Sequence, residues 1–96
     1  MATYTKISFE KQALPIVQES IQLGKKIIEQ KLAVYKKRLL NYEKTKHMDT
    51  ATFLRLFEKG ELGDSKELIE WEHVASVASL LRKKLDALKS IQYDEP

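Results

Sequence analysis

The stretch WEHVASVASLLRKKLDAL, residues 71–88, decides the fold. Its apolar residues recur at steps of three and four, the spacing that places side chains on one face of an α-helix. These residues are Trp71, Val74, Ala78, Leu81, Leu85 and Leu88. Such unbroken alternation is typical of a coiled-coil seam. We therefore predict a long helix over residues 65–91 that packs against another helix.

A second long helix is predicted over residues 15–46. Pro15 is tolerated in a first helical turn, and after it only Gly24 disfavours a helix. The main apolar stripe contains Leu14, Val17, Ile21, Ile28, Leu32, Tyr35, Leu39 and Tyr42. A shorter second stripe lies beside it and contains Ile16, Leu23, Ile27 and Val34. The combined face is too wide for a two-stranded coil, so we expect more than one helix to pack against it.

A short helix is predicted between the two long ones, over residues 50–59. Asp49 or Thr50 is a suitable N-cap, and Gly60 is a C-terminal stop. The spacing of Asp64 and Glu67 is that of a capping box and predicts the start of the last helix.

The predicted fold is an all-α single domain, residues 1–96. The long helices each span about 40–45 Å at about 1.5 Å per residue, so they match in length and can form an antiparallel hairpin. A hairpin this narrow leaves apolar surface uncovered, so we expect a homodimer that forms a four-helix bundle. Residues 1–10 alternate weakly between apolar and polar side chains and are predicted to be an extended arm or a short strand. A strand there needs a partner strand, and this sequence predicts no other.

Composition narrows the function classes. The chain has no cysteine, which excludes disulfides and thiolate metal sites, and we expect a cytoplasmic protein. No apolar run approaches the roughly 20 residues that a membrane span needs, and no signal-peptide pattern opens the chain. The net charge is +3, with a basic first half and an acidic second half. The charge difference favours attraction between the halves over a polyanion-binding face.

Candidate catalytic groups are few. The only histidines are His47 and His73, and the sequence contains no glycine-rich phosphate loop and no serine-histidine motif. Glu70 and His73 have the Glu-x-x-His spacing of helix-bundle metal sites, but such sites need further carboxylates that face inward. We therefore predict no enzyme activity, no cofactor and no bound metal.

Two surfaces are candidates for binding. A lysine stripe on the first long helix contains Lys25, Lys26, Lys36, Lys37 and Lys44. It could follow a phosphate backbone, although it lacks the aromatic and base-reading side chains of a specific nucleic-acid surface. The bulky side chains of the second half gather in a cluster that contains Phe53, Leu54, Phe57, Leu62 and Trp71. This cluster either anchors a partner protein or plugs the end of the hairpin.

The segment FLRLFEKGELGD, residues 53–64, is followed by Glu70-Trp71-Glu72 and a leucine-rich helix that carries lysines. This half of the chain resembles a group of small archaeal and bacterial proteins that look like antitoxins of toxin–antitoxin pairs. Residues 9–15 agree more loosely with the same group. The resemblance implies a non-catalytic protein that binds and neutralises a toxin, for example a nuclease encoded by a neighbouring gene. Antitoxins commonly have a separate DNA-binding module and a disordered tail, and this sequence shows neither plainly.

On this interpretation the partner-binding residues are Phe53, Phe57, Leu62 and Trp71. A nucleic-acid binder that uses the lysine stripe is the alternative function.

Overall fold

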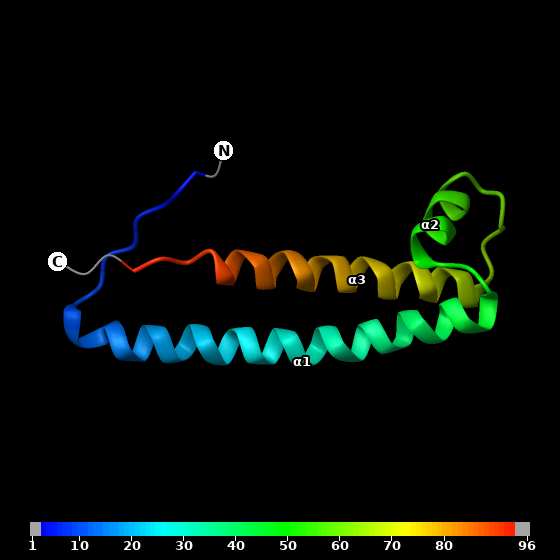
Figure 1. Cartoon of the computed structure of the whole chain (residues 1–96). Coiled ribbons are helices and arrows are strands. Elements are labelled where there is room, and N and C mark those ends of the chain that lie inside the picture. The colour runs from blue at the N-terminus through cyan, green and yellow to red at the C-terminus, as the bar shows by residue number, and fades with distance from the viewer. Residues whose placement is uncertain (1–2, 94–96) are drawn as a thin grey trace.

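The computed structural model describes residues 3–93, and its regular structure is helical (Figure 1). A 3-10 turn, Lys11–Ala13, leads into α1, Leu14–Lys46. The short helix α2 covers Thr50–Glu58, and α3 covers Lys66–Lys89. The all-α fold class is confirmed, and each helix lies within two residues of its predicted bounds.

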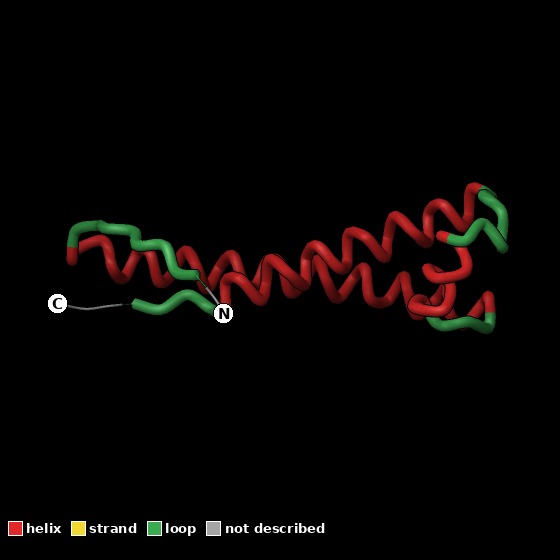
Figure 2. Tube along the Cα trace, turned by 90° about the horizontal axis from the view of Figure 1, so that it is seen from above, coloured by secondary structure: helices red, strands yellow, loops and turns green. Residues whose placement is uncertain are grey.

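The long helices α1 and α3 run antiparallel and cross at a shallow angle, with α2 beside α3 at one end of the pair (Figures 1 and 2). The chain measures 56 × 27 × 18 Å, and its Cα radius of gyration is 18.5 Å. A compact domain of this length has a radius of gyration of about 12.5 Å. The molecule is therefore an elongated hairpin with a closed α2 end and an open end near Leu14.

The centre of the hairpin is held by one apolar cluster. Leu32 of α1 is buried against Ala78, Leu81 and Leu85 of α3. Ile28, Tyr35, Leu39 and Val77 are partly buried around them. These residues belong to the predicted seams of the two long helices, except for Val77, which lies beside the seam.

Gly24 does not interrupt α1, which runs without a break from Leu14 to Lys46. A Cβ atom built on Gly24 would lie 3.7 Å from Leu88 Cδ1, an ordinary van der Waals contact. α1 ends at His47, which adopts the left-handed conformation with φ 54°, so the chain turns sharply toward α2.

Residues 3–10 are exposed and form no strand, which agrees with the extended arm and not with the alternative of a short strand; residues 1–2 lie outside the described part. Two local predictions differ from the structure. The N-cap of α3 is Ser65, whose Oγ accepts a hydrogen bond from Leu68 N–H at 3.3 Å, so the capping box at Asp64 is wrong by one residue. Glu67 instead forms an ion pair with Lys46 at 3.0 Å, the only salt bridge among residues 3–93. Direct ion pairing between the two charged halves is thus limited, within residues 3–93, to this one contact at the α2 end.

The hairpin exposes more surface than a compact protein of its size. Its accessible area is 7888 Å², whereas a typical folded monomer of 11.2 kDa exposes about 5,700 Å². Part of the difference belongs to the exposed arm, and the rest reflects the one-sided packing of α1 and α3. Each long helix has only one full-length neighbour, so most of its circumference faces solvent.

Candidate functional site

A stack of three aromatic rings fixes the α2 end of the hairpin. The ring of Trp71 lies parallel to that of Phe53, with centroids 3.8 Å apart and planes 2° apart. The ring of Tyr42 stacks on Trp71 at 5.5 Å and 9°. Because the three rings come from α1, α2 and α3, the stack joins all three helices at one point. Phe57 extends it, with its ring tilted by 33° and 5.3 Å from Phe53.

Polar contacts at the start of α2 complete this joint. Trp71 Nε1–H donates a hydrogen bond to Thr50 Oγ1 at 3.1 Å, which satisfies the buried indole nitrogen. Glu43 Oε2 accepts a hydrogen bond from Thr50 N–H at 2.8 Å. Asp49 is the N-cap and accepts one from Thr52 N–H at 2.7 Å. The hydrogen bonds from Thr52 hold the pKa of the Asp49 carboxyl below its ordinary value.

The stack changes the interpretation of the predicted partner-binding residues. Phe53 is 0% exposed and Trp71 is 1% exposed, so the chain's own fold covers both side chains. Phe53 and Trp71 plug the end of the hairpin and present no surface to a partner. Phe57 and Leu62 are half-buried and keep an accessible part. Of the four predicted residues, the structure therefore leaves only these two at the surface.

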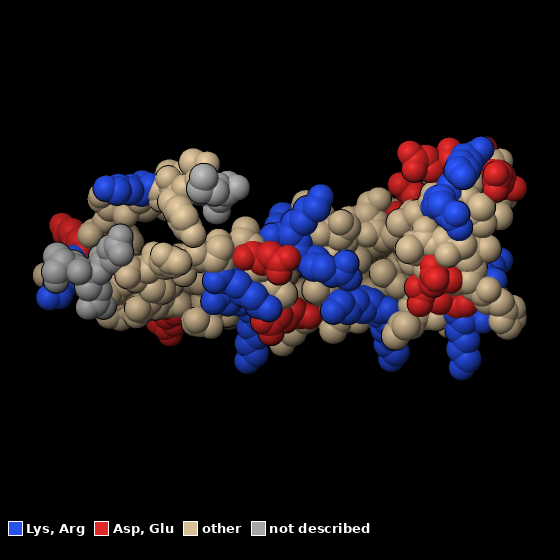
Figure 3. All heavy atoms as spheres, turned by 45° about the horizontal axis from the view of Figure 1, so that its top comes forward, with Lys and Arg blue, Asp and Glu red and all other residues tan. Residues whose placement is uncertain are grey.

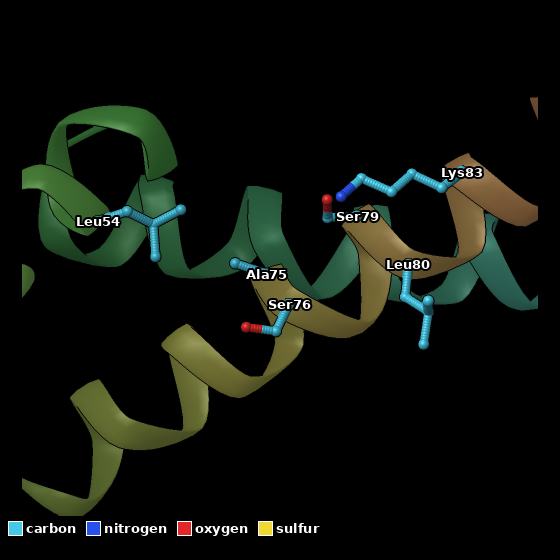
Figure 4. A pocket seen from close by; sticks show the side chains of 6 residues that line it. All are labelled: Leu54, Ala75, Ser76, Ser79, Leu80 and Lys83. Atoms are coloured by element: carbon cyan, nitrogen blue, oxygen red, sulfur yellow. The ribbon is translucent and has the colours of Figure 1, made fainter. Parts of the chain in front are cut away.

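A groove runs between α2 and α3 on the side of α3 away from α1. Leu54 of α2 forms one wall, and the small residues Ala75, Ser76 and Ser79 line its α3 side together with Leu80 and Lys83 (Figure 4). We call this the α2–α3 groove, and its volume is about 350 Å³. Leu80 is 52% exposed, and the Lys83 side chain extends along α3 toward Ser79.

The sequence prediction included Leu54 in the aromatic cluster but missed the α3 side of the groove. Leu80 lies off the predicted seam of α3. Most of the residues three and four positions away from it are polar, namely Ser76, Lys83 and Lys84, so Leu80 belongs to no second apolar stripe that the sequence could show. Only the position of α2, fixed by the ring stack, turns these residues into a groove.

The second stripe of α1 is uncovered. Ile16, Leu23, Ile27 and Val34 are between 43% and 65% exposed. A shallow hollow of about 340 Å³ lies at the C-terminal end of this stripe and is lined by Val34, Lys37, Arg38, Asn41 and Tyr42. The sequence predicts that another helix packs on the second stripe, and within residues 3–93 no segment does.

The lysine stripe lies on a different side of α1. Four of its members are exposed, and Lys25 is half-buried. In Figure 3, basic side chains are prominent along the middle of the hairpin with acidic side chains among them, and side chains of both signs lie around the α2 end. The visible face is therefore mixed in charge, with no continuous basic surface.

Neither histidine joins a group of potential metal ligands. His47 forms the C-cap of α1, and His73 is exposed on α3. Across residues 3–93, no three histidine, cysteine, aspartate or glutamate side chains come together in a group that could hold a metal ion. Among the same residues, no helix has both the length and the apolar character to cross a membrane.

No family model, curated protein or solved structure matches this chain.

Proposed function

We propose that this protein is a non-catalytic module that binds a partner protein in the α2–α3 groove. The observation that carries the proposal is the way α2 is held. One ring stack and its polar contacts dock a nine-residue helix against α3 and leave an apolar groove beside it. Concave, mostly apolar surfaces with a few polar groups are typical binding sites.

The lining of the groove indicates the chemistry of its occupant. Leu54 and Leu80 offer apolar contacts, and the small side chains between them leave room for a partner side chain. Lys83 supplies a positive charge at one end, where a carboxylate of the partner can bind. An amphipathic helix with an acidic residue beside its apolar face would complement both the apolar contacts and the positive charge of the groove. Phe57 and Leu62 do not line the groove, but both are half-buried, on α2 and in the loop after it, and add accessible apolar surface at this end of the molecule.

The resemblance to antitoxin-like proteins gives the partner a class. In this proposal the partner is a toxin encoded by a neighbouring gene, and the chain neutralises it by covering its surface. The small size of the chain and its large accessible surface support a binding role.

The test is an affinity purification of the tagged chain from its native cells, with mass spectrometry of the co-purifying species. We compare the wild type with Leu80→Glu, which places a charge in the groove, and with Leu40→Glu. Leu40 is 64% exposed and belongs to α1, which contributes no residue to the groove, so it is a matched control.

We expect one small protein to be retained in stoichiometric amount by the wild type and by Leu40→Glu, and lost from Leu80→Glu. Expression of that protein by itself should arrest growth. Its co-expression with the tagged chain should restore growth. Equal retention by all three chains would refute binding in the groove, and no effect on growth would refute the antitoxin role.

The lysine stripe remains the alternative, and the same experiment tests it with a nuclease-treated sample. Nucleic acid that co-purifies without protein would contradict our proposal and favour the lysine stripe. In that case binding should fall steeply with salt and should be lost when the stripe is changed to glutamate. The residues changed would be Lys25, Lys26, Lys36, Lys37 and Lys44.

A further inference from the structure

The second stripe of α1 is an apolar surface that the groove does not use. At about 100° per residue, its centre lies about 120° around the helix from the main stripe that packs on α3. Lys31 and Arg38 lie between the two stripes, and both are exposed. These charges separate the second stripe from the α1–α3 core, so another helix that covers the stripe would form its own contact with α1.

The spacing of the second stripe is symmetric. Ile16, Leu23, Ile27 and Val34 are separated by seven, four and seven residues, so the pattern is the same when it is read from either end. Two copies of such a stripe match when their helices run antiparallel around a two-fold axis near position 25. A self-complementary patch of this kind is the requirement for a two-fold symmetric dimer.

We propose that α1 pairs antiparallel with α1 of a second copy of this chain. In this register Leu23 packs on Ile27 of the second copy, and Ile16 packs on Val34 of the second copy. Ser20 and Gln30 occupy the intervening positions of the stripe and face each other across the interface. Polar residues in the two copies thus meet each other, as the apolar residues do.

The hollow at the end of the second stripe agrees with this register. It is lined by Val34, Lys37 and Asn41 among others, and its volume is about 340 Å³. In the antiparallel pair it faces Ile16 and the Lys11–Ala13 turn of the second copy. The beginning of one α1 thereby occupies the depression on the other.

The whole chain has more excess surface than one side of a standard interface covers. The chain exposes about 2,200 Å² more than a compact monomer of its mass. A standard protein interface covers about 800 Å² on each partner. Pairing through α1 also leaves α3 on the outside of the dimer, so the α2–α3 groove stays open in both copies.

Like charges oppose the dimer and give it a salt dependence that can be measured. Lys26 lies on the flank of the second stripe, close to the proposed two-fold axis, so the two copies of Lys26 approach each other. At each end of the pair, Lys11 of one copy comes near Lys37 and Arg38 of the other. Salt screens such repulsion. The dimer should therefore tighten between 50 and 500 mM salt, and Lys26→Gln should tighten it at low salt. A protein–nucleic acid complex has the opposite salt dependence.

The first test is sedimentation equilibrium of the purified chain over a range of concentrations. We expect the wild type to reach twice the chain mass of 11.2 kDa. Leu23→Glu should weaken the dimer by at least about 100-fold, because each dimer would bury two charges against apolar side chains. The matched control is Leu40→Glu, an equally exposed leucine outside the stripe, which should remain dimeric. Circular dichroism should show unchanged helix content in both variants, because both side chains are exposed.

The second test examines the register. Ile27→Lys alone should also be monomeric. A mixture of Leu23→Glu and Ile27→Lys chains should form a one-to-one heterodimer in native mass spectrometry. In that heterodimer the glutamate at 23 faces the lysine at 27, and the other Leu23–Ile27 contact is intact. Pairing in any register that places position 23 against position 23 would give no such rescue.

A monomeric wild type at 100 μM, a dimer that Leu23→Glu does not weaken, or a mixture that does not pair would each overturn the proposal. The first outcome would assign the second stripe to a different protein. The dimer and the proposed function are tested separately, because Leu80→Glu should keep the dimer and lose the partner. Leu23→Glu should lose the dimer and keep the partner.

Discussion

Replacing Phe53 by alanine tests whether the ring stack holds the α2 end together. The side chain is fully buried, and its ring lies 3.8 Å from that of Trp71, so truncation leaves a cavity in the joint of three helices. Phe→Ala substitutions at such sites cost about 3–5 kcal/mol. For a domain of this size, each kcal/mol corresponds to about 4–8 °C in Tm. We therefore expect Tm to fall by at least about 12 °C.

Trp71 is the only tryptophan, so its fluorescence reports the stack directly. In Phe53→Ala we expect its emission to shift to longer wavelength before the hairpin unfolds, because one face of the indole becomes exposed to water. The matched control is Phe57→Ala, which removes the same atoms from a half-buried ring and should cost about 1–2 kcal/mol. A Phe53→Ala variant with wild-type emission and a Tm within about 2 °C of the wild type would refute the role of the stack.

Substitutions at four further positions test the local structure. Thr50→Val leaves the buried indole N–H of Trp71 without an acceptor and should lower the free energy of unfolding by about 1–3 kcal/mol in urea titrations, whereas Thr50→Ser should not. Hydrogen bonds lower the pKa of Asp49 in the folded state, so its stabilisation is complete at neutral pH and is lost as pH falls below the ordinary pKa of the carboxyl and through the folded value. Asp49→Asn should make the acid limb of thermal unfolding less steep, and an unchanged pH dependence would contradict this assignment. Gly24→Ala should raise the free energy of unfolding by about 1 kcal/mol, because its Cβ would meet only ordinary contacts. Gly60→Ala should instead lower the free energy of unfolding, because φ at Gly60 is +74°. A less stable Gly24→Ala variant or a more stable Gly60→Ala variant would contradict the corresponding argument.

The three helices could be predicted because their signals are local and periodic. The stripes repeat at helical spacing over about eight turns in α1 and about five turns in α3, and Asp49 and Gly60 mark the limits of α2. The pairing of α1 with α3 follows from the apolar stripe that each presents, although the predicted match in length is only approximate, with 33 residues in α1 and 24 in α3. The boundary at Ser65 was missed because Asp64 and Ser65 are both good N-caps, and their difference depends on backbone angles that the sequence does not display.

The candidate site could be predicted only in part. An aromatic cluster that anchors a partner and one that plugs a hairpin have the same composition. At Trp71, the residue that decides between these two roles is Tyr42, which is 29 residues away in the sequence and stacks on the indole ring. The groove could not be predicted either, because its walls come from two helices whose relative position depends on that stack.

The antiparallel hairpin also implies an order of folding. Contacts at the α2 end join residues close in sequence, such as Tyr42 and Trp71, whereas Gly24 and Leu88 at the other end are 64 residues apart. Closing the shorter loop costs less entropy, so pairing should begin at the α2 end and advance toward Leu14. Opening should follow the reverse order, and amide hydrogens near Leu14 should exchange first. The second stripe extends into this weaker end of α1. If two copies associate through it, the protection of these amide hydrogens against exchange should rise with protein concentration.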